Sequence, residues 1–118
     1  MRHFSCLADN VDCYNVAPIS IGAFATVSQD AYLCAATHDY NDPDFRLYSL
    51  PINIGDHAWV CARAVVQPGV TMHEGSVLAL GAIATRDLNP WTVYAGVPAR
   101  ALKNRAITKS MTAVEALV

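Results

Sequence analysis

The histidine best placed for acid–base chemistry is His38, which ends an apolar block, LCAATH, just before a polar segment. A neutral imidazole near pH 7 is well matched to removing a proton from a hydroxyl group that attacks a carbonyl carbon. The residues alone favour a loop histidine without a chemical task. The other histidines are His3, His57 and His73, and the four lack the spacing of metal ligands. We therefore predict no bound metal.

Three acidic residues, Asp39, Asp42 and Asp44, follow His38 in the polar segment. One of them could orient the imidazole by accepting a hydrogen bond from it. A run of acids in a polar loop is more often simply solvated. The sequence leaves both interpretations open.

Positive charge is concentrated near the C-terminal end. The chain has 8 basic and 10 acidic residues and a formal net charge of −2, which gives no general basic surface for nucleic acid. Clustered Arg and Lys favour binding of anions, phosphate groups in particular. The alternative is a solvated polar end segment. The basic residues after position 85 are Arg86, Arg100, Lys103, Arg105 and Lys109.

The composition predicts one folded domain within an assembly. With 118 residues, 53% of them hydrophobic, the chain has the makeup of a single globular domain. Only 15% of the residues are charged, so we expect other subunits to cover part of the surface. No apolar run reaches the roughly 18 residues that span a bilayer. The opening MRHFSCLADN lacks the apolar region of a signal peptide, so we expect a cytoplasmic protein without membrane contact.

The cysteines Cys6, Cys13, Cys34 and Cys61 match no recognised framework. Their spacing fits neither paired zinc ligands nor a dense set of disulfides. We predict free thiols, mostly buried.

A six-residue repeat organises the elements that must position these residues. From Ile54 to Ala84 every sixth residue is apolar, and the residue four positions later is mostly small. The same pattern starts at Ile21, and Leu7 and Cys13 join it after a two-residue insertion. Such a pattern fits short strands that turn corners, three to a coil of about 18 residues. On an α-helix the same positions would not form a stripe.

The repeat therefore predicts an all-β fold, a single-stranded parallel β-helix. Residues 39–53 (DYNDPDFRLYSLPIN) break the period and are predicted to form a protruding loop. Two prolines end the repeat after Leu88, so we assign residues 1–103 to the β-helix domain. Residues 104–118 form a short C-terminal tail, either helical or frayed.

Three motifs, together with the repeat, resemble a known family: THDY at the start of the insertion, IGDHAWV after it and YAGVPARAL near the C-terminal end. From about Leu7 to Lys103 the chain resembles the left-handed β-helix, or hexapeptide-repeat, acyltransferases. It is most similar to the O-acetyltransferases of the colanic-acid, nodulation-factor, maltose and galactoside type. The left-handed coil is implied by this resemblance alone and departs from the usual right-handed crossover.

The resemblance implies an enzyme that uses acetyl-CoA as co-substrate and moves the acetyl group directly to a hydroxyl of a sugar or glycan precursor. His38 would be the general base, and backbone N–H groups would stabilise the oxyanion. The family also implies a homotrimer with each active site between neighbouring β-helices. N-acetylation of an amino sugar or related amine is the alternative reaction. Because family members usually have a longer N-terminal region, a truncated, inactive binding or scaffold subunit is the alternative outside the enzymes.

Other site residues take their roles from the same resemblance. Asn15 and Trp59 match positions that face the acceptor, although Asn15 also suits a turn. The segment from Tyr94 to Arg100 would line the coenzyme groove, with Gly96 allowing close approach. The residues that match coenzyme-binding positions are Ala62, Leu80, Gly81, Thr85, Arg86, Arg100 and Lys103.

Overall fold

The computed structural model describes residues 1–107, which form strands and turns without a helix. None of these residues belongs to a helix that could cross a membrane. The predicted tail, residues 104–118, lies largely outside the described part. Its first residue is in a strand that ends at Asn104.

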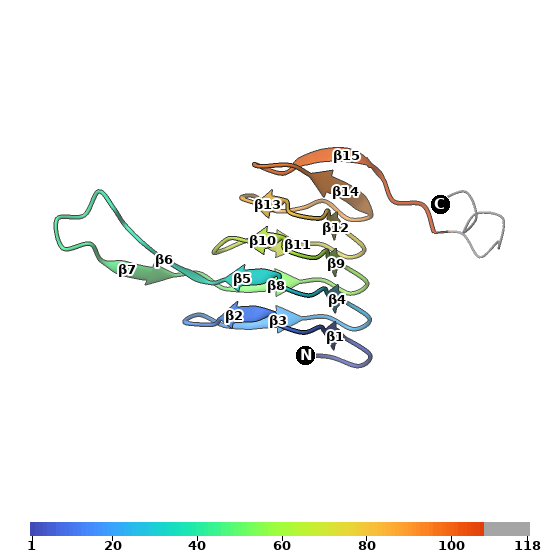
Figure 1. Ribbon diagram of the computed structural model, residues 1–118, viewed down its shortest axis with the longest axis horizontal. Coiled ribbons are helices and arrows are strands. Elements are labelled where there is room, and N and C mark those ends of the chain that lie inside the picture. Colours follow the sequence, from blue (N-terminus) through green and yellow to red (C-terminus); the bar gives the residue numbers. More distant parts are fainter. Residues whose placement is uncertain (108–118) are drawn as a thin grey trace.

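The chain winds in successive coils whose short strands form three faces (Figure 1). The first face contains β1 (Cys6–Leu7), β4 (Thr26–Val27), β9 (Trp59–Val60), β12 (Val77–Leu78), β14 (Thr92–Ala95) and β15 (Arg100–Asn104). The second face contains β2 (Asp12–Tyr14), β5 (Tyr32–Cys34), β10 (Val65–Val66) and β13 (Ile83–Ala84). The third face contains β3 (Ile19–Ile21), β8 (Ile52–Ile54) and β11 (Thr71–Met72). All pairs within these faces are parallel except β14 with β15.

The apolar positions of the repeat point into the coils, as predicted. From Ile21 onward each is at most 4% exposed, and residues of successive coils stack on one another. Small residues such as Ala58 and Ala64 are buried at the bends, where a larger side chain would not fit. This stacking forms one continuous core along the β-helix. The inward residues include Val27, Val60, Leu78, Leu33, Val66, Ala84, Ile21, Ile54 and Met72.

Three corners join the faces. Corner 1 leads from the third face to the first, corner 2 from the first to the second, and corner 3 from the second to the third. At corners 1 and 2 one turn position has a positive φ in successive coils, because the chain changes direction there within a few residues. At corner 1 these residues are Phe4, Phe24, His57, Gly75 and Trp91, and at corner 2 they are Asn10, Asp30, Arg63 and Gly81.

The pairing confirms the predicted coil length and both insertions. Ile83 pairs with Val65, which lies one coil of the predicted length earlier in the chain. Val65 in turn pairs with Tyr32, and the chain between these two residues is longer than one regular coil. The additional residues form a hairpin at corner 3. The coil between Asp12 and its partner Tyr32 exceeds the regular length by the predicted two-residue insertion.

The hairpin consists of β6 (Ala36–His38) and the antiparallel β7 (Leu47–Ser49), and it projects from the coil stack (Figure 1). The coil resumes at Ile52, which pairs with Ile19 and is fully buried. The insertion therefore covers residues 36–50 and not the predicted 39–53. The prediction placed its end too late because it resumed the repeat at Ile54, whereas Ile52 and Asn53 already belong to β8.

All four cysteines are free thiols, as predicted, but the prediction that most are buried was wrong. Only Cys61 is buried, whereas Cys6 is exposed and Cys13 and Cys34 are half-buried. Cys6 and Cys34 occupy outward positions of their strands. Cys13 points inward, but its strand lies at the edge of the second face and is covered on one side only.

Candidate active site

His38 is the last residue of β6 and is exposed on the hairpin. Its Nδ1 lies 2.8 Å from the carbonyl oxygen of Phe45, and the two rings stack with 4.3 Å between centroids and 13° between planes. A carbonyl oxygen only accepts hydrogen bonds, so Nδ1 carries the proton and donates it. Nε2 is then left with a lone pair, which is the tautomer that a general base requires.

The acidic residues of the hairpin do not orient His38. Asp39 and Asp42 accept hydrogen bonds from backbone N–H groups two residues further on, at 3.0 and 2.9 Å. Asp42 also pairs with Arg46, with 3.4 Å between Oδ2 and Nε. These carboxylates shape the tip of the hairpin, and the orienting group is the Phe45 carbonyl. Sequence reasoning missed it because a backbone acceptor leaves no mark in the residue types.

Three of the predicted coenzyme-binding residues come together at corner 2. Ala62 and Gly81 lie in successive coils, and the Gly81 N–H donates to the Ala62 carbonyl oxygen at 3.1 Å. The Leu80 side chain is 73% exposed. A Cβ added to Gly81 would meet no atom within 4 Å, so the surface at this corner is open.

The segment between β14 and β15 continues this surface in the next coil. The Ile83 N–H donates to the Gly96 carbonyl oxygen at 3.1 Å, and the Ala99 N–H donates to the Ile83 carbonyl oxygen at 2.9 Å. These bonds hold the segment along β13, next to corner 2. Arg100 follows it directly, as the first residue of β15.

The predicted cations are exposed but not gathered. Arg86 follows β13 at corner 3, next to Thr85, whereas Arg100 and Lys103 lie in β15 opposite Ala95 and Val93. Within residues 1–107 none of the three cations forms an ion pair. They are therefore available to an anionic ligand from different sides of the last coil.

Trp59 lies in β9 on the first face, just before corner 2. Its side chain is 43% exposed, and its Nε1–H donates to the Ser28 hydroxyl of the neighbouring coil at 2.8 Å. This bond fixes the indole against the coil surface while leaving much of the ring open. Asn15 is exposed after β2, at corner 3.

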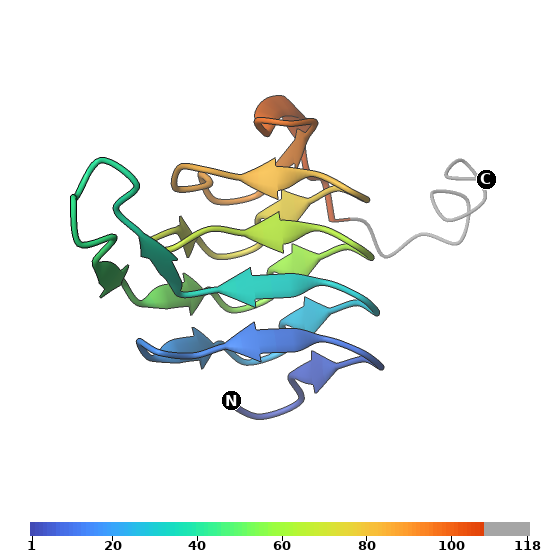
Figure 2. The same ribbon diagram turned by 60° about the vertical axis from the view of Figure 1, so that its left-hand side comes forward.

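One chain thus places the predicted site residues in two groups, at opposite edges of the second face. The strand β5 runs from corner 2 toward corner 3, where the hairpin leaves (Figure 2). The corner 3 edge carries Asn15, His38, Thr85 and Arg86, and the corner 2 edge carries Trp59, Ala62, Leu80, Gly81 and Arg100. Lys103 lies further along β15, over the first face.

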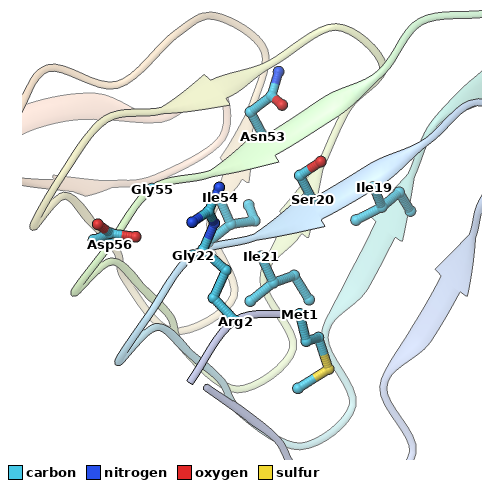
Figure 3. Close-up of a pocket in the computed structure, with 10 residues that line it drawn as sticks. All are labelled: Met1, Arg2, Ile19, Ser20, Ile21, Gly22, Asn53, Ile54, Gly55 and Asp56. Atoms are coloured by element: carbon cyan, nitrogen blue, oxygen red, sulfur yellow. The ribbon is translucent and has the colours of Figure 1, made fainter. Parts of the chain in front are cut away.

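Two hollows accompany these surfaces. A cavity of about 410 Å³ lies between the hairpin and the second face, lined among others by Tyr32, Cys34 and Tyr48. A hydrogen bond with Cys34, reinforced by burial, raises the pKa of Tyr32 to about 12, so its phenol stays protonated. A second hollow of about 360 Å³ on the third face, lined among others by Ser20 and Asn53, contains none of the predicted site residues (Figure 3).

No three His, Cys, Asp or Glu side chains within residues 1–107 are arranged to hold a metal ion. The groups of this surface that can take part in chemistry are the His38 imidazole, the backbone N–H groups of corner 2 and the cations of the last coil.

No protein-family model matches the chain. By sequence, it is 32% identical over 106 residues to the putative colanic acid biosynthesis acetyltransferase WcaF of Escherichia coli K12, a match that covers 90% of this chain and 58% of WcaF. A solved maltose O-acetyltransferase from Clostridium difficile 630 is 26% identical, with a TM-score of 0.74 over 87% of this chain and 60% of that one. The chain is related to these acetyltransferases. The resemblance inferred from its motifs is confirmed.

A third protein shares the fold. AntD, an N-acyltransferase from Bacillus cereus solved with coenzyme A and dTDP-4-amino-4,6-dideoxyglucose, is 22% identical, with a TM-score of 0.81 over 96% of this chain and 67% of AntD. The chain spans about half the length of the curated relatives it matches.

Proposed function

We propose that the protein is an acetyl-CoA-dependent O-acetyltransferase that acts on a hydroxyl group of a sugar or glycan precursor. The observation that carries the proposal is the hydrogen bond from His38 Nδ1 to the Phe45 carbonyl, which leaves Nε2 as a proton acceptor. The relationship to WcaF and to maltose O-acetyltransferase supports the substrate class. In this proposal the coil is left-handed and the enzyme works in the cytoplasm.

In the proposed reaction the acceptor oxygen attacks the thioester carbonyl of acetyl-CoA while its proton passes to His38 Nε2. Backbone N–H groups stabilise the negative oxygen of the tetrahedral intermediate. The C–S bond then breaks, and the CoA sulfur leaves and takes up the proton from His38. The products are the acetyl ester and free CoA.

The coenzyme lies along corner 2 in this proposal. The open surface at Ala62, Leu80 and Gly81 accepts its extended arm, and the cations Arg100 and Lys103 face its phosphates. Since the Gly81 N–H is already bonded to Ala62, the arm pairs with other backbone groups of the corner. Arg86 and Thr85, at corner 3, are reached from a neighbouring subunit.

A complete site requires a second copy of the chain, because His38 and the coenzyme surface lie at opposite edges of the second face. Placing corner 3 of one subunit against corner 2 of the next brings the two groups together, and three such contacts close a ring. We therefore propose a homotrimer. Sedimentation equilibrium is expected to give three times the chain mass, and a monomer or dimer at micromolar concentrations would contradict the assembly.

The reaction is tested by mixing the protein with acetyl-CoA and a panel of sugars, half carrying free amino groups, and measuring the CoA thiol released. We expect release that depends on a hydroxyl acceptor and a product whose acetyl group is removed by mild alkali. Release with amino sugars alone, giving an alkali-stable product, would assign N-acetylation instead. No release with any acceptor, despite CoA binding, would favour a binding or scaffold subunit.

A further inference from the structure

Arg105, just beyond β15, connects three coils of the structure at corner 1. Its Nη1 donates to the carbonyl oxygens of His57 and Gly75, at 2.7 and 3.1 Å. Its guanidinium carbon lies 5.5 Å from the centroid of the Trp91 ring, and its backbone N–H donates to the Trp91 carbonyl oxygen at 2.8 Å. His57, Gly75 and Trp91 are the positive-φ residues of three successive turns.

The Trp91 ring that receives Arg105 is itself fixed in place. A Cβ added to Gly75 would overlap the indole, so glycine at this turn leaves the space that the ring occupies. On the other side of Gly75 the stack continues through His57 and Phe24, whose ring centroids are 5.1 Å apart. Arg105 therefore lies against the end of an aromatic stack along corner 1, at the end nearest β15.

The strand β15 needs such an anchor. It pairs with β14 alone, in antiparallel orientation and with an irregularity between Val93 and Tyr94, and all five of its residues are exposed. An edge strand that buries no side chain has little beyond its backbone hydrogen bonds to keep it from fraying. Arg105 fixes the C-terminal end of this strand through a permanently charged group that donates to two carbonyls.

We infer that Arg105 is a positioning residue for the coenzyme: it holds β15, and with it Arg100 and Lys103, in place over the coil stack. The inference rests on the proposed function in its assignment of Arg100 and Lys103 to the coenzyme. Two donors of its guanidinium, both on Nη1, are engaged by the His57 and Gly75 carbonyls, and the group lies against the Trp91 ring, so in this inference Arg105 acts without contacting the phosphates. Arg105 thus influences the coenzyme site by holding β15 in position.

The test combines hydrogen exchange of the ligand-free protein with kinetics. In Arg105→Ala we expect the amides of residues 100–104 to exchange faster, while those of β9 and β10 stay at the wild-type rate. The KM for acetyl-CoA is expected to rise about tenfold, the loss typical of one charge-assisted contact. The kcat is expected to stay near wild type, because Arg105 does not touch the hairpin that carries His38. Arg105→Lys keeps the charge and is expected to restore part of the affinity.

Phe24→Leu is the matched control. Phe24 belongs to the same aromatic stack but has no contact with β15, so its loss is expected to lower the midpoint of thermal unfolding without changing the KM for acetyl-CoA. An equal rise in KM for Phe24→Leu and Arg105→Ala would overturn the inference, and so would unchanged exchange of residues 100–104. If the wild type binds no CoA by calorimetry, the proposed function is overturned together with the coenzyme role of Arg105. If the wild type binds CoA normally but the exchange of residues 100–104 is unchanged in Arg105→Ala, the inference alone is overturned.

Discussion

Phe45 holds His38 in two ways at once, through its backbone and through its ring. Its carbonyl oxygen accepts the Nδ1 proton at 2.8 Å, and its ring stacks on the imidazole at 4.3 Å between centroids. Phe45 has a φ of 49°, in the left-handed region that an aromatic residue rarely occupies. The hairpin therefore fixes the ring of His38 and keeps its proton on Nδ1.

Replacing Phe45 tests the contribution of its ring separately from that of its carbonyl oxygen. Asn tolerates positive φ, so Phe45→Asn keeps the carbonyl in place and removes the stacking partner. Because an aromatic pair is worth about 0.5 to 1.5 kcal/mol, we expect kcat to fall by less than about tenfold, with the KM for acetyl-CoA unchanged. Steady-state kinetics measure both. An unchanged kcat would show that the ring does not support His38.

Removal of one exposed cation of β15 tests the assignment of the coenzyme surface. Arg100→Ala is expected to weaken CoA binding by about 1 to 3 kcal/mol, the range for a charge-assisted contact. Titration calorimetry with CoA measures the loss. Arg46→Ala is the control, because it removes a cation that pairs with Asp42 on the hairpin. If Arg100→Ala and wild type bind CoA equally, the basic residues are a solvated face.

Gly75 and Gly81 form a matched pair for the packing at the corners. Their φ angles are 69° and 68°, so alanine at either position costs roughly 1 to 2 kcal/mol of backbone energy. Only at Gly75 does the added Cβ overlap the Trp91 ring, so Gly75→Ala is expected to lose more free energy of unfolding than Gly81→Ala. Urea denaturation measures both. Equal losses would mean that the indole is not fixed against this turn.

The thiols are expected to differ in reactivity. Burial raises the pKa of the Cys61 thiol, with the nearby charge of Arg105 working in the opposite direction, so less of it is thiolate at pH 8 than of an exposed cysteine. Iodoacetamide should therefore label Cys6 well before Cys61, as followed by peptide mass spectrometry. In urea the two rates should converge. Labelling of native Cys61 as fast as Cys6 would contradict the burial.

The fold could be predicted because the same six-residue pattern of apolar and small residues recurs along the chain. Each inward position, such as Val60 or Leu78, restates the same spacing, so one irregular block does not hide the period. The limits of the hairpin were missed because an outward residue of a coil strand, such as Asn53, has the same polarity as a loop residue. The antiparallel strand β15 was also missed, since no alternation of polar and apolar residues in Arg100–Asn104 indicates the direction of the strand.

The site could be predicted only as far as side chains identify it. His38 was singled out by its position before the polar insertion together with the family resemblance, whereas its partner is a carbonyl oxygen, which every residue has. Arg105 was counted with the basic residues, and its contacts with His57 and Gly75 arise from the stacking of distant coils. The division of the site between two edges of the second face likewise follows from the path of the chain and not from any motif.

The measurement that tests the central claim most directly is the turnover of His38→Ala with an accepted sugar. Because Nε2 is the proposed proton acceptor, kcat is expected to fall by roughly 10²- to 10⁴-fold, while the affinity for CoA, measured by calorimetry, stays near wild type. A variant that keeps more than about a tenth of the wild-type kcat would remove His38 from the mechanism.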